Sequence, residues 1–290
     1  MAGIARRIWL TLRRRAYDAW MHDRFPRELR ASDVFLVSYP KSGRNWVAYF
    51  LAHLIRSRIP SAPDELTLNN WPHILPVIDR MTGVDTIAIR RCRDRPDPRV
   101  FATHTPHTDL LPRIVYIARD PRDVAVSYFH YQQRTDPHPI TDMNGFLDVF
   151  LADRLWVGGW QDHVMRWLEQ TADPQRGLLV RYEDLRSDPQ AGFTRIVEFI
   201  GLRSDPVAVE SAIQASSFDA MRKVEDRFGV NDARGDDTVR FTRSGRAGEW
   251  RTQLEPHQIA RIQDTCGDAM AELGYAHHDH PDSPAGPAVS

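Results

Sequence analysis

The residues best suited to chemistry lie at positions 39–46, where the chain reads YPKSGRNW. A short apolar run precedes them at 34–38, and an amphipathic pattern follows. We therefore expect a strand, a Lys41-Ser42-Gly43 turn and a helix, whose first backbone N–H groups have no intrahelical partner and lie at the positive end of the helix dipole. Such a turn binds a phosphate or a sulfate, to which Lys41 adds a full charge.

This turn differs from the Walker sequence G-x-x-x-x-G-K-[ST], because its lysine precedes Ser-Gly and no upstream glycine has the required spacing. Of the 38 basic residues only Lys41 and Lys223 are lysine. A compact ammonium can follow a moving charge where a planar guanidinium imposes its own geometry. On its own, the motif would also fit an ordinary strand-turn-helix with a surface lysine.

A second candidate segment follows the strand-like run IVYIA at 114–118 and reads RDPRDVAVSYFHY. It places Arg119 at the carboxyl end of a strand and Ser127 on the next helix. In an open α/β sheet ligands bind at that edge, and an arginine with a hydroxyl can hold a second phosphate. The alternative is a surface turn with Arg119–Asp123 or Asp120–Arg122 ion pairs.

A third segment, RVFATHTPH at 99–107, predicts a strand that ends at Thr103-His104. His104 would then face the same edge as Lys41. With an ordinary pKa near 6.5, a histidine beside a substrate hydroxyl can accept its proton at cellular pH.

Strands that alternate with helices predict an α/β fold in one domain. A chain of 290 residues with 42% apolar content can bury a full core, and it contains no repeat or long linker. The two cysteines, Cys92 and Cys266, do not form a disulfide framework, which fits a reducing, cytoplasmic setting. A net charge of −1 argues against a general nucleic-acid binder.

Over residues 33–252 the chain resembles the cytosolic sulfotransferases, which transfer a sulfuryl group from 3′-phosphoadenosine 5′-phosphosulfate (PAPS) to a hydroxyl or an amine. Four motifs occur in the family's order: YPKSGRNW, RDPRDVAVSYFH, RYEDL and RSGRAGEW. The resemblance implies a single domain with a central parallel sheet flanked by helices, related to the P-loop nucleotide kinases. It also implies a domain at 31–275.

The resemblance assigns roles residue by residue. Lys41 would stabilise the leaving phosphate and His104 would be the general base. The remaining donor contacts would be Ser42, Gly43, Arg44 and Asn45 at the 5′ group, Trp46, Tyr182 and Phe218 around adenine, and Arg119, Ser127, Arg243, Ser244 and Gly245 at the 3′-phosphate. Ser216 matches a small hydroxyl residue of the family.

Several positions depart from the family pattern. Arg44 and Asn45 stand where many members have Thr-Thr, while Ala102 and Ser244 stand where lysines are common. These changes could shift transition-state charge onto Lys41 and Arg44. No metal is expected, because no ligand spacing accompanies the loop and fixed donors can neutralise the developing charge.

The two ends of the chain predict different behaviour. Residues 1–30 are arginine-rich with Trp9 and Trp20 at helical spacing, which indicates an amphipathic helix that packs on the domain or rests on an anionic membrane surface. We favour packing. Residues 276–290 read as a disordered tail.

The acceptor is expected to be a small aromatic or lipid-like molecule held by loops at about 60–98, 131–145 and 226–242. The first loop carries the apolar residues Trp71, Pro72, Ile74, Leu75 and Met81. The sequence leaves the oligomeric state open. It also leaves two other functions open: a P-loop-type kinase of small molecules or nucleotides, and a non-catalytic protein that binds nucleotide and membrane.

Overall fold

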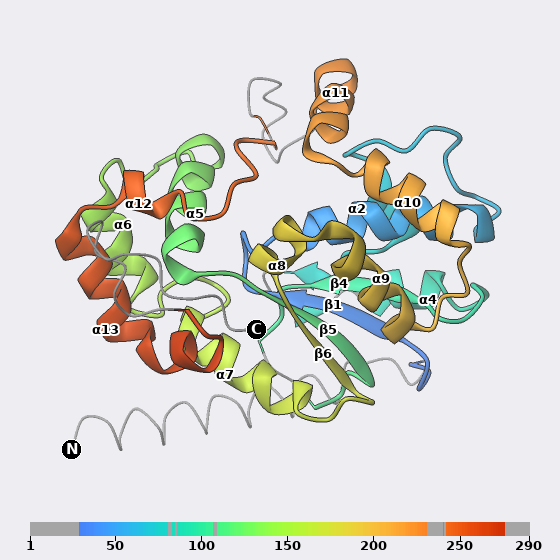
Figure 1. The fold of residues 1–290 in the computed structure, drawn as a ribbon, viewed down its shortest axis with the longest axis horizontal. Coiled ribbons are helices and arrows are strands. Elements are labelled where there is room, and N and C mark those ends of the chain that lie inside the picture. The colour runs from blue at the N-terminus through green and yellow to red at the C-terminus, as the bar shows by residue number, and fades with distance from the viewer. Residues whose placement is uncertain are drawn as a thin grey trace.

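The computed structural model describes residues 29–80, 83–84, 86–106, 109–230, 240 and 242–275. In this part of the chain, four parallel strands form a central sheet in the order β4-β1-β5-β6 (Figure 1). The strands are β1 (Val34–Ser38), β4 (Val100–Thr103), β5 (Arg113–Ala118) and β6 (Gly177–Arg181). The strands expected at 34–38, at 114–118 and up to Thr103 are therefore confirmed.

Helices cover both faces of the sheet, because successive side chains of each strand point to opposite sides. Leu36 and Val115 face a core shared with α2 (Arg44–Ile55), α9 (Pro189–Ile200) and α10 (Pro206–Ala215). Phe35 and Tyr116 face a second core. The helices of that second core are α5 (Pro121–Thr135), α6 (Met143–Phe150), α7 (Trp160–Thr171), α12 (Trp250–Gln253) and α13 (Pro256–Glu272). The expected single α/β domain with a parallel sheet is confirmed.

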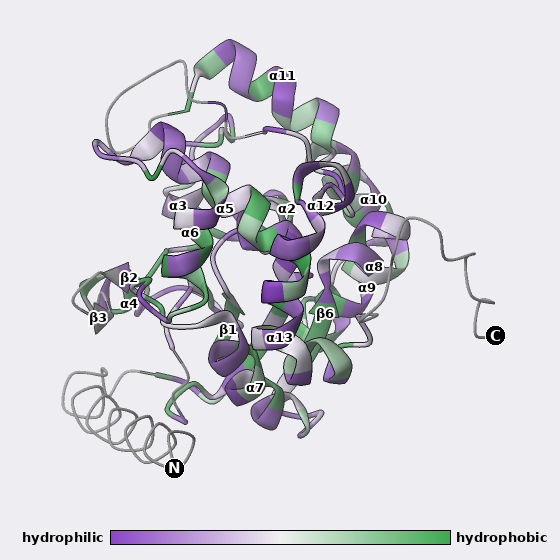
Figure 2. Cartoon of the chain, turned by 90° about the vertical axis from the view of Figure 1, so that its left-hand side faces the viewer, coloured by the Kyte–Doolittle hydropathy of each residue, from purple (hydrophilic) through white to green (hydrophobic). Residues whose placement is uncertain are grey.

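Shorter elements complete the described chain. They are the 3₁₀ helix η1 (Arg56–Arg58), α3 (Trp71–Ile74), the antiparallel pair β2 (Asp79–Arg80) and β3 (Gly83–Val84), α4 (Thr86–Arg91), α8 (Tyr182–Ser187) and α11 (Phe218–Phe228). Strand β6 is largely hydrophobic in Figure 2, whereas α11, which projects at the top of that view, is mostly hydrophilic.

Asp-Pro pairs start three of the helices. The Asp120 side chain accepts a hydrogen bond from the Arg122 N–H at 2.9 Å, and Pro121 takes the first helical position of α5. Asp188 and Asp205 cap α9 and α10 in the same way. A carboxylate at this position satisfies a backbone donor that the helix leaves free, and proline needs no such partner.

Strand β1 lies between β4 and β5, and the helices that follow β1 and β5 lie on opposite faces of the sheet. Val37 pairs with Thr103, and Ser38 pairs with Ile117. The segments that leave these three strands therefore meet at one edge. In an α/β sheet, this switch in direction is where ligands bind.

Both predicted terminal segments fall largely outside the described residues, since 1–28 and 276–290 are not described. None of the described helices has the length and apolar character that a bilayer-spanning segment requires.

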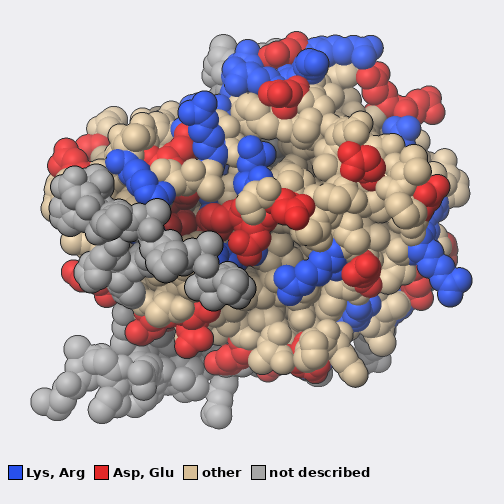
Figure 3. All heavy atoms as spheres, viewed as in Figure 1, with Lys and Arg blue, Asp and Glu red and all other residues tan. Residues whose placement is uncertain are grey.

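On the face shown in Figure 3, basic and acidic side chains are interspersed.

Candidate active site

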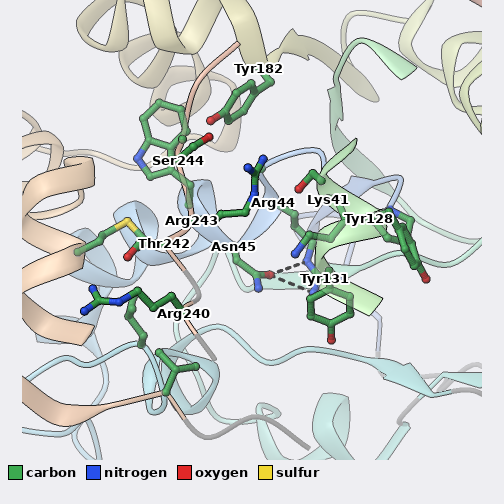
Figure 4. A pocket seen from close by; sticks show the side chains of 18 of the residues that line it. Lys41, Arg44, Asn45, Tyr128, Tyr131, Tyr182, Arg240, Thr242, Arg243 and Ser244 are labelled. Atoms are coloured by element: carbon green, nitrogen blue, oxygen red, sulfur yellow. Dashed lines mark hydrogen bonds between the residues drawn. The ribbon is translucent and has the colours of Figure 1, made fainter. Parts of the chain in front are cut away.

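A cavity of about 590 Å³ opens at the carboxyl ends of β1, β4 and β5. Its described lining contains seven cationic side chains and no carboxylate. The cations are Lys41, Arg44, Arg119, Arg134, Arg186, Arg240 and Arg243. In Figure 4, Tyr182 and Ser244 lie on one side of Lys41 and Arg44, and Tyr131 lies on the other. This surplus of positive charge suits a ligand with several negative charges.

The turn between β1 and α2 has a tightly constrained backbone. Gly43 has φ of 95°, and a Cβ atom placed there would lie 2.5 Å from Cδ2 of Tyr182. Lys41 also adopts a left-handed conformation, with φ of 70°. No side chain caps α2. The Trp46 N–H donates to the Gly43 carbonyl at 3.0 Å, so the backbone donors of Arg44 and Asn45 are the ones that an anion could use.

Lys41 lies among other cations. Its Nζ is 4.1 Å from the centroid of the Tyr131 ring, and within the described chain this ammonium group forms no hydrogen bond or ion pair. Burial, together with the charges of Arg134 and Arg119, lowers the pKa of Lys41 from 10.5 to about 7. A bound anion would restore the full charge of this ammonium.

Arg119 joins two loops that are distant in sequence. Its guanidinium donates to the carbonyl of Lys41 at 3.0 Å and to that of Arg246 at 2.9 Å. It also lies 4.4 Å from the Tyr182 ring centroid, and its Nε is buried with no hydrogen-bond partner in the described chain. Asp123 is 3.9 Å away. Arg122 also pairs with Asp120 at 2.7 Å, so both ion pairs expected of an ordinary surface turn are present. Arg119 nevertheless lines the cavity.

The late glycine-containing loop at 243–249 closes over the same cavity. Gly245 has φ of 63°, and a Cβ atom there would lie 2.5 Å from Cδ2 of Phe218. Asp123 holds the loop by accepting the N–H groups of Gly248 at 2.6 Å and Trp250 at 3.0 Å. The loop thereby brings Arg243, Ser244 and Gly245 to the cavity.

Arg243 does not present a free guanidinium, since it forms an ion pair with Glu249. Arg44 is likewise occupied. It donates to Asp79 at 2.5 Å and to the side chain of its neighbour Asn45 at 3.1 Å. The sequence predicts that both arginines line the site, but it does not show their acidic partners.

Aromatic rings line another part of the cavity. Trp46, Tyr182 and Phe218 all contribute to it, and the Trp46 and Tyr182 rings meet edge to face at 5.8 Å. The Trp46 Nε1 donates to the carbonyl of Ser216 at 2.8 Å. Flat faces of this kind accept a purine base.

Two predicted contacts, Ser42 and Ser216, do not line the cavity. The Ser42 Oγ is buried, and none of the described residues offers it a hydrogen-bond partner. Ser216 follows the last residue of α10, and its Oγ donates to the carbonyl of Ala212 in that helix at 2.8 Å. The other predicted site residues all line the cavity: Lys41, Gly43, Arg44, Asn45, Trp46, His104, Arg119, Ser127, Tyr182, Phe218, Arg243, Ser244 and Gly245.

His104 follows β4 and lines the cavity with its half-buried imidazole. Its Nδ1 lies 2.7 Å from the carbonyl oxygen of Ser38. Because a carbonyl can only accept, Nδ1 carries the proton and Nε2 keeps its lone pair. The pKa differs from the ordinary value assumed from the sequence. Burial and the charge of Arg44 lower the pKa of His104 to about 3, so the imidazole is neutral near pH 7.

Some lining residues were not named individually from the sequence, although two of them fall in the predicted acceptor loop at 131–145. Tyr131 and Arg134 follow Ser127 by four and seven residues on α5, a spacing that puts all three on one helical face. That spacing could have identified them. The Arg134 Nε is buried without a partner. Trp156 lies on the same cavity wall as His104, with ring centroids 6.4 Å apart, and no pattern in the sequence marks it.

The three predicted acceptor loops all reach the cavity, through Trp71 and Pro72, Tyr131 and Arg134, and Val230. Ile74 and Leu75 are instead buried in the first core, and Met81 lies outside the described residues. Among described residues, no group of three His, Cys, Asp or Glu side chains could hold a metal ion.

Comparisons with known proteins show which family the chain is similar to. The sulfotransferase domain family matches residues 31–274. The chain is 31% identical to sulfotransferase 1A1 of Bos taurus over 236 residues, which is 76% of this chain and 77% of the bovine protein. It is 28% identical to cytosolic sulfotransferase 17 of Arabidopsis thaliana over 271 residues, covering 85% of this chain and 76% of the plant protein.

Solved structures are similar in fold. Mouse sulfotransferase SULT7A1, crystallised with PAP, superposes with a TM-score of 0.65 at 25% identity, covering 89% of this chain and 91% of the mouse chain. Retinol dehydratase, solved with androsterone and the inactive cofactor PAP, superposes with a TM-score of 0.66 at 22% identity, covering 83% of this chain and 81% of the other.

Proposed function

Because the chain belongs to the sulfotransferase domain family and is a PAPS-dependent sulfotransferase, we propose that His104 takes the acceptor proton while Lys41 neutralises charge on the leaving phosphate. The observation that carries this assignment is a cavity with seven lining cations, no lining carboxylate among the described residues, and a neutral imidazole. No observation favours a kinase or a non-catalytic binding protein.

The residues of the cavity fit the donor PAPS, which supplies the sulfuryl group when bound. Among the described residues, the Lys41 ammonium and the Nε of Arg119 have no hydrogen-bond partner, and such groups need an anionic or accepting ligand. The turn at 41–45 would hold the 5′ end through Lys41, Gly43, Arg44 and Asn45, which line the cavity, and Trp46, Tyr182 and Phe218 would hold adenine. Arg119, Ser127 and the loop at 243–245 would hold the 3′-phosphate, and Ser216 would act through Trp46, which donates to its carbonyl.

The tautomer of His104 prepares it to act as a base. Its Nδ1–H is bound to the Ser38 carbonyl, so only Nε2 can accept a proton from an acceptor hydroxyl. An anion bound beside Arg44 would oppose the charge that lowers the pKa of His104, so the imidazole becomes a stronger base in the loaded site. Lys41 can then place its ammonium where charge develops.

In this proposal the acceptor is a small molecule. The apolar residues that line the cavity around His104 favour an aromatic or lipid-like acceptor. Trp71, Pro72, Tyr128 and Trp156 line that region. Androsterone and retinol, which related structures contain, are molecules of this apolar kind. A cytoplasmic location is supported by the cytosolic plant relative, and contact of residues 1–30 with a membrane stays a prediction.

A His104→Ala variant tests the assignment of the base. We expect near-normal affinity for 3′-phosphoadenosine 5′-phosphate by calorimetry and a loss of turnover of about 10²- to 10⁴-fold. Acidic phenols should be affected least, because they are already partly ionised, and alkyl alcohols most. A variant that keeps most of its activity toward an alcohol would show that His104 is structural.

A matched arginine pair tests the 3′-phosphate assignment. Arg113 and Arg119 stand at the two ends of β5, and each donates to backbone carbonyls and stacks on an aromatic ring. Arg119→Ala should remove the preference for 3′-phosphoadenosine 5′-phosphate over 5′-AMP, while Arg113→Ala should retain it. Equal preferences in the two variants would contradict the assignment.

A further inference from the structure

Asp79 lies behind the cavity wall and contacts three parts of the site. Its Oδ2 pairs with the guanidinium of Arg44 at 2.5 Å. Its Oδ1 accepts the hydroxyl of Thr103 at 2.7 Å and the backbone N–H of His104 at 2.6 Å. The Thr103 oxygen in turn accepts the N–H of Thr105 at 2.9 Å. One carboxylate thus joins the start of α2 to the segment that carries the imidazole.

The backbone around 76–79 explains how Asp79 reaches this position. The Ala102 N–H donates to the carbonyl of Pro76, and the Ile78 N–H donates to the carbonyl of Ala102, both at 2.9 Å. Val77 therefore runs parallel to β4 as an additional edge segment. Parallel pairing brings the end of that segment level with the end of β4, so Asp79 lies beside Thr103 and His104.

We propose that Asp79 is a positioning residue for sulfuryl transfer, which fixes the backbone of His104 and the guanidinium of Arg44 in a single arrangement. The inference rests on the function proposed above. Asp79 does not line the cavity, so it acts through the two residues that do.

The charges around the imidazole show why a carboxylate is needed there. The described groups that act on His104 are Arg44, Asp79, the Ser38 carbonyl and His163. Arg44 disfavours the protonated imidazole, and Asp79 favours it. Asp79 also occupies Arg44, whose remaining donors face Asn45. Asp79 therefore fixes where the positive charge of Arg44 lies relative to His104, and within the described part of the chain Lys41 forms no ion pair.

A second Asp–Arg pair in the same two strands supplies the control. Asp33 and Arg99 precede β1 and β4 at the opposite end of the sheet, and their side chains pair at 2.7 and 2.5 Å. Both side chains are almost fully buried. Asp33→Asn therefore removes a comparable ion pair without approaching the cavity.

The experiment compares Asp79→Asn with Asp33→Asn, normalised to the folded fraction. We expect Asp79→Asn to lower kcat about 10²-fold, as a misplaced catalytic group does, while affinity for 3′-phosphoadenosine 5′-phosphate changes less than about threefold. Long-range ¹H–¹⁵N spectra of the unliganded protein, assigned with His104→Ala, should show loss of the single Nδ1–H tautomer. Asp33→Asn should keep both kcat and the tautomer.

Unchanged kcat and tautomer in Asp79→Asn would overturn the inference, provided His104→Ala is inactive. Full activity in His104→Ala would instead overturn the proposed function. If Asp79→Asn does not fold, Thr103→Val tests the same link, because it removes one donor to Asp79 and should disturb the tautomer and lower kcat about threefold to tenfold. Asp79→Glu keeps the charge and should recover more kcat than Asp79→Asn, and equal values would also contradict the inference.

Discussion

The two ends of the sheet differ in how their basic side chains are paired with acidic ones. Before the strands begin, Arg99 is matched by Asp33, and their side chains are 1% and 0% exposed. After the strands end, seven cations line a cavity to which the described residues contribute no carboxylate. Two acidic residues at this end, Asp79 and Glu249, pair with the lining residues Arg44 and Arg243 but do not line the cavity themselves.

This difference shows how one fold separates stability from binding. A fully paired buried charge stabilises its surroundings only while both partners are present. Cations that repel each other disfavour the empty cavity, as the lowered pKa of Lys41 shows, and an anion removes that repulsion. We call the side with Asp33 and Arg99, where β1 and β4 begin, the strand-start end, and the side with the cavity the strand-end edge. The strand-start end is therefore expected to determine the stability of the fold. The strand-end edge is expected to determine ligand affinity and turnover rate.

The largest expected effect is at the strand-start end. Asp33→Asn leaves the Arg99 guanidinium buried without its anion, and we expect a loss of about 3–5 kcal/mol in the free energy of unfolding. Urea denaturation followed by tryptophan fluorescence measures it. Turnover per folded molecule should not change. A large fall in kcat would show that the two ends of the sheet are not independent.

At the strand-end edge, Lys41→Met should lower kcat about 10²- to 10³-fold, because it removes a donor aimed at developing charge. The other lysine, Lys223, is exposed on α11 and provides the control. Lys223→Met should leave kcat unchanged. Lys41→Arg should remain strongly impaired, and near-normal turnover in that variant would contradict the assigned role.

Glycines sharpen the comparison further. An alanine at Gly43 would require a left-handed conformation and would also displace Tyr182. Gly201 has φ of 81° but open space around it. Both substitutions should cost about 1–2 kcal/mol of stability from the backbone alone. Only Gly43→Ala should also weaken binding of 3′-phosphoadenosine 5′-phosphate, measured by calorimetry, and equal affinities would argue against contact at this turn.

The smallest effect concerns pH. The charged form of Lys41 binds anions, and its pKa is about 7, so affinity for 3′-phosphoadenosine 5′-phosphate should fall about fivefold from pH 7 to pH 8. His104 is neutral throughout this range because its pKa is about 3. Calorimetry in buffers of different ionisation enthalpy should detect proton uptake on binding. Lys41→Met should abolish both the slope and the uptake.

Local patterns predicted much of the site from sequence. Strand ends followed by Lys41, His104 and Arg119 were identifiable because an apolar run, a turn and a helical pattern are all short-range features. Asp79 was not identifiable, because its position depends on a single parallel bridge between Val77 and Ala102. The low pKa of His104 depends on burial and on Arg44, which only the packed structure specifies.

The left-handed backbone of Lys41 places a limit on how stable this protein can be. A side chain at φ of 70° costs about 1–2 kcal/mol relative to a glycine in the same conformation. Glycine loses part of that advantage through the greater freedom of its unfolded chain, yet Lys41→Gly should still raise the unfolding free energy by a few tenths of a kcal/mol to about 1. Selection for thermal tolerance alone would therefore tend to remove this ammonium, and only a requirement for turnover would retain it.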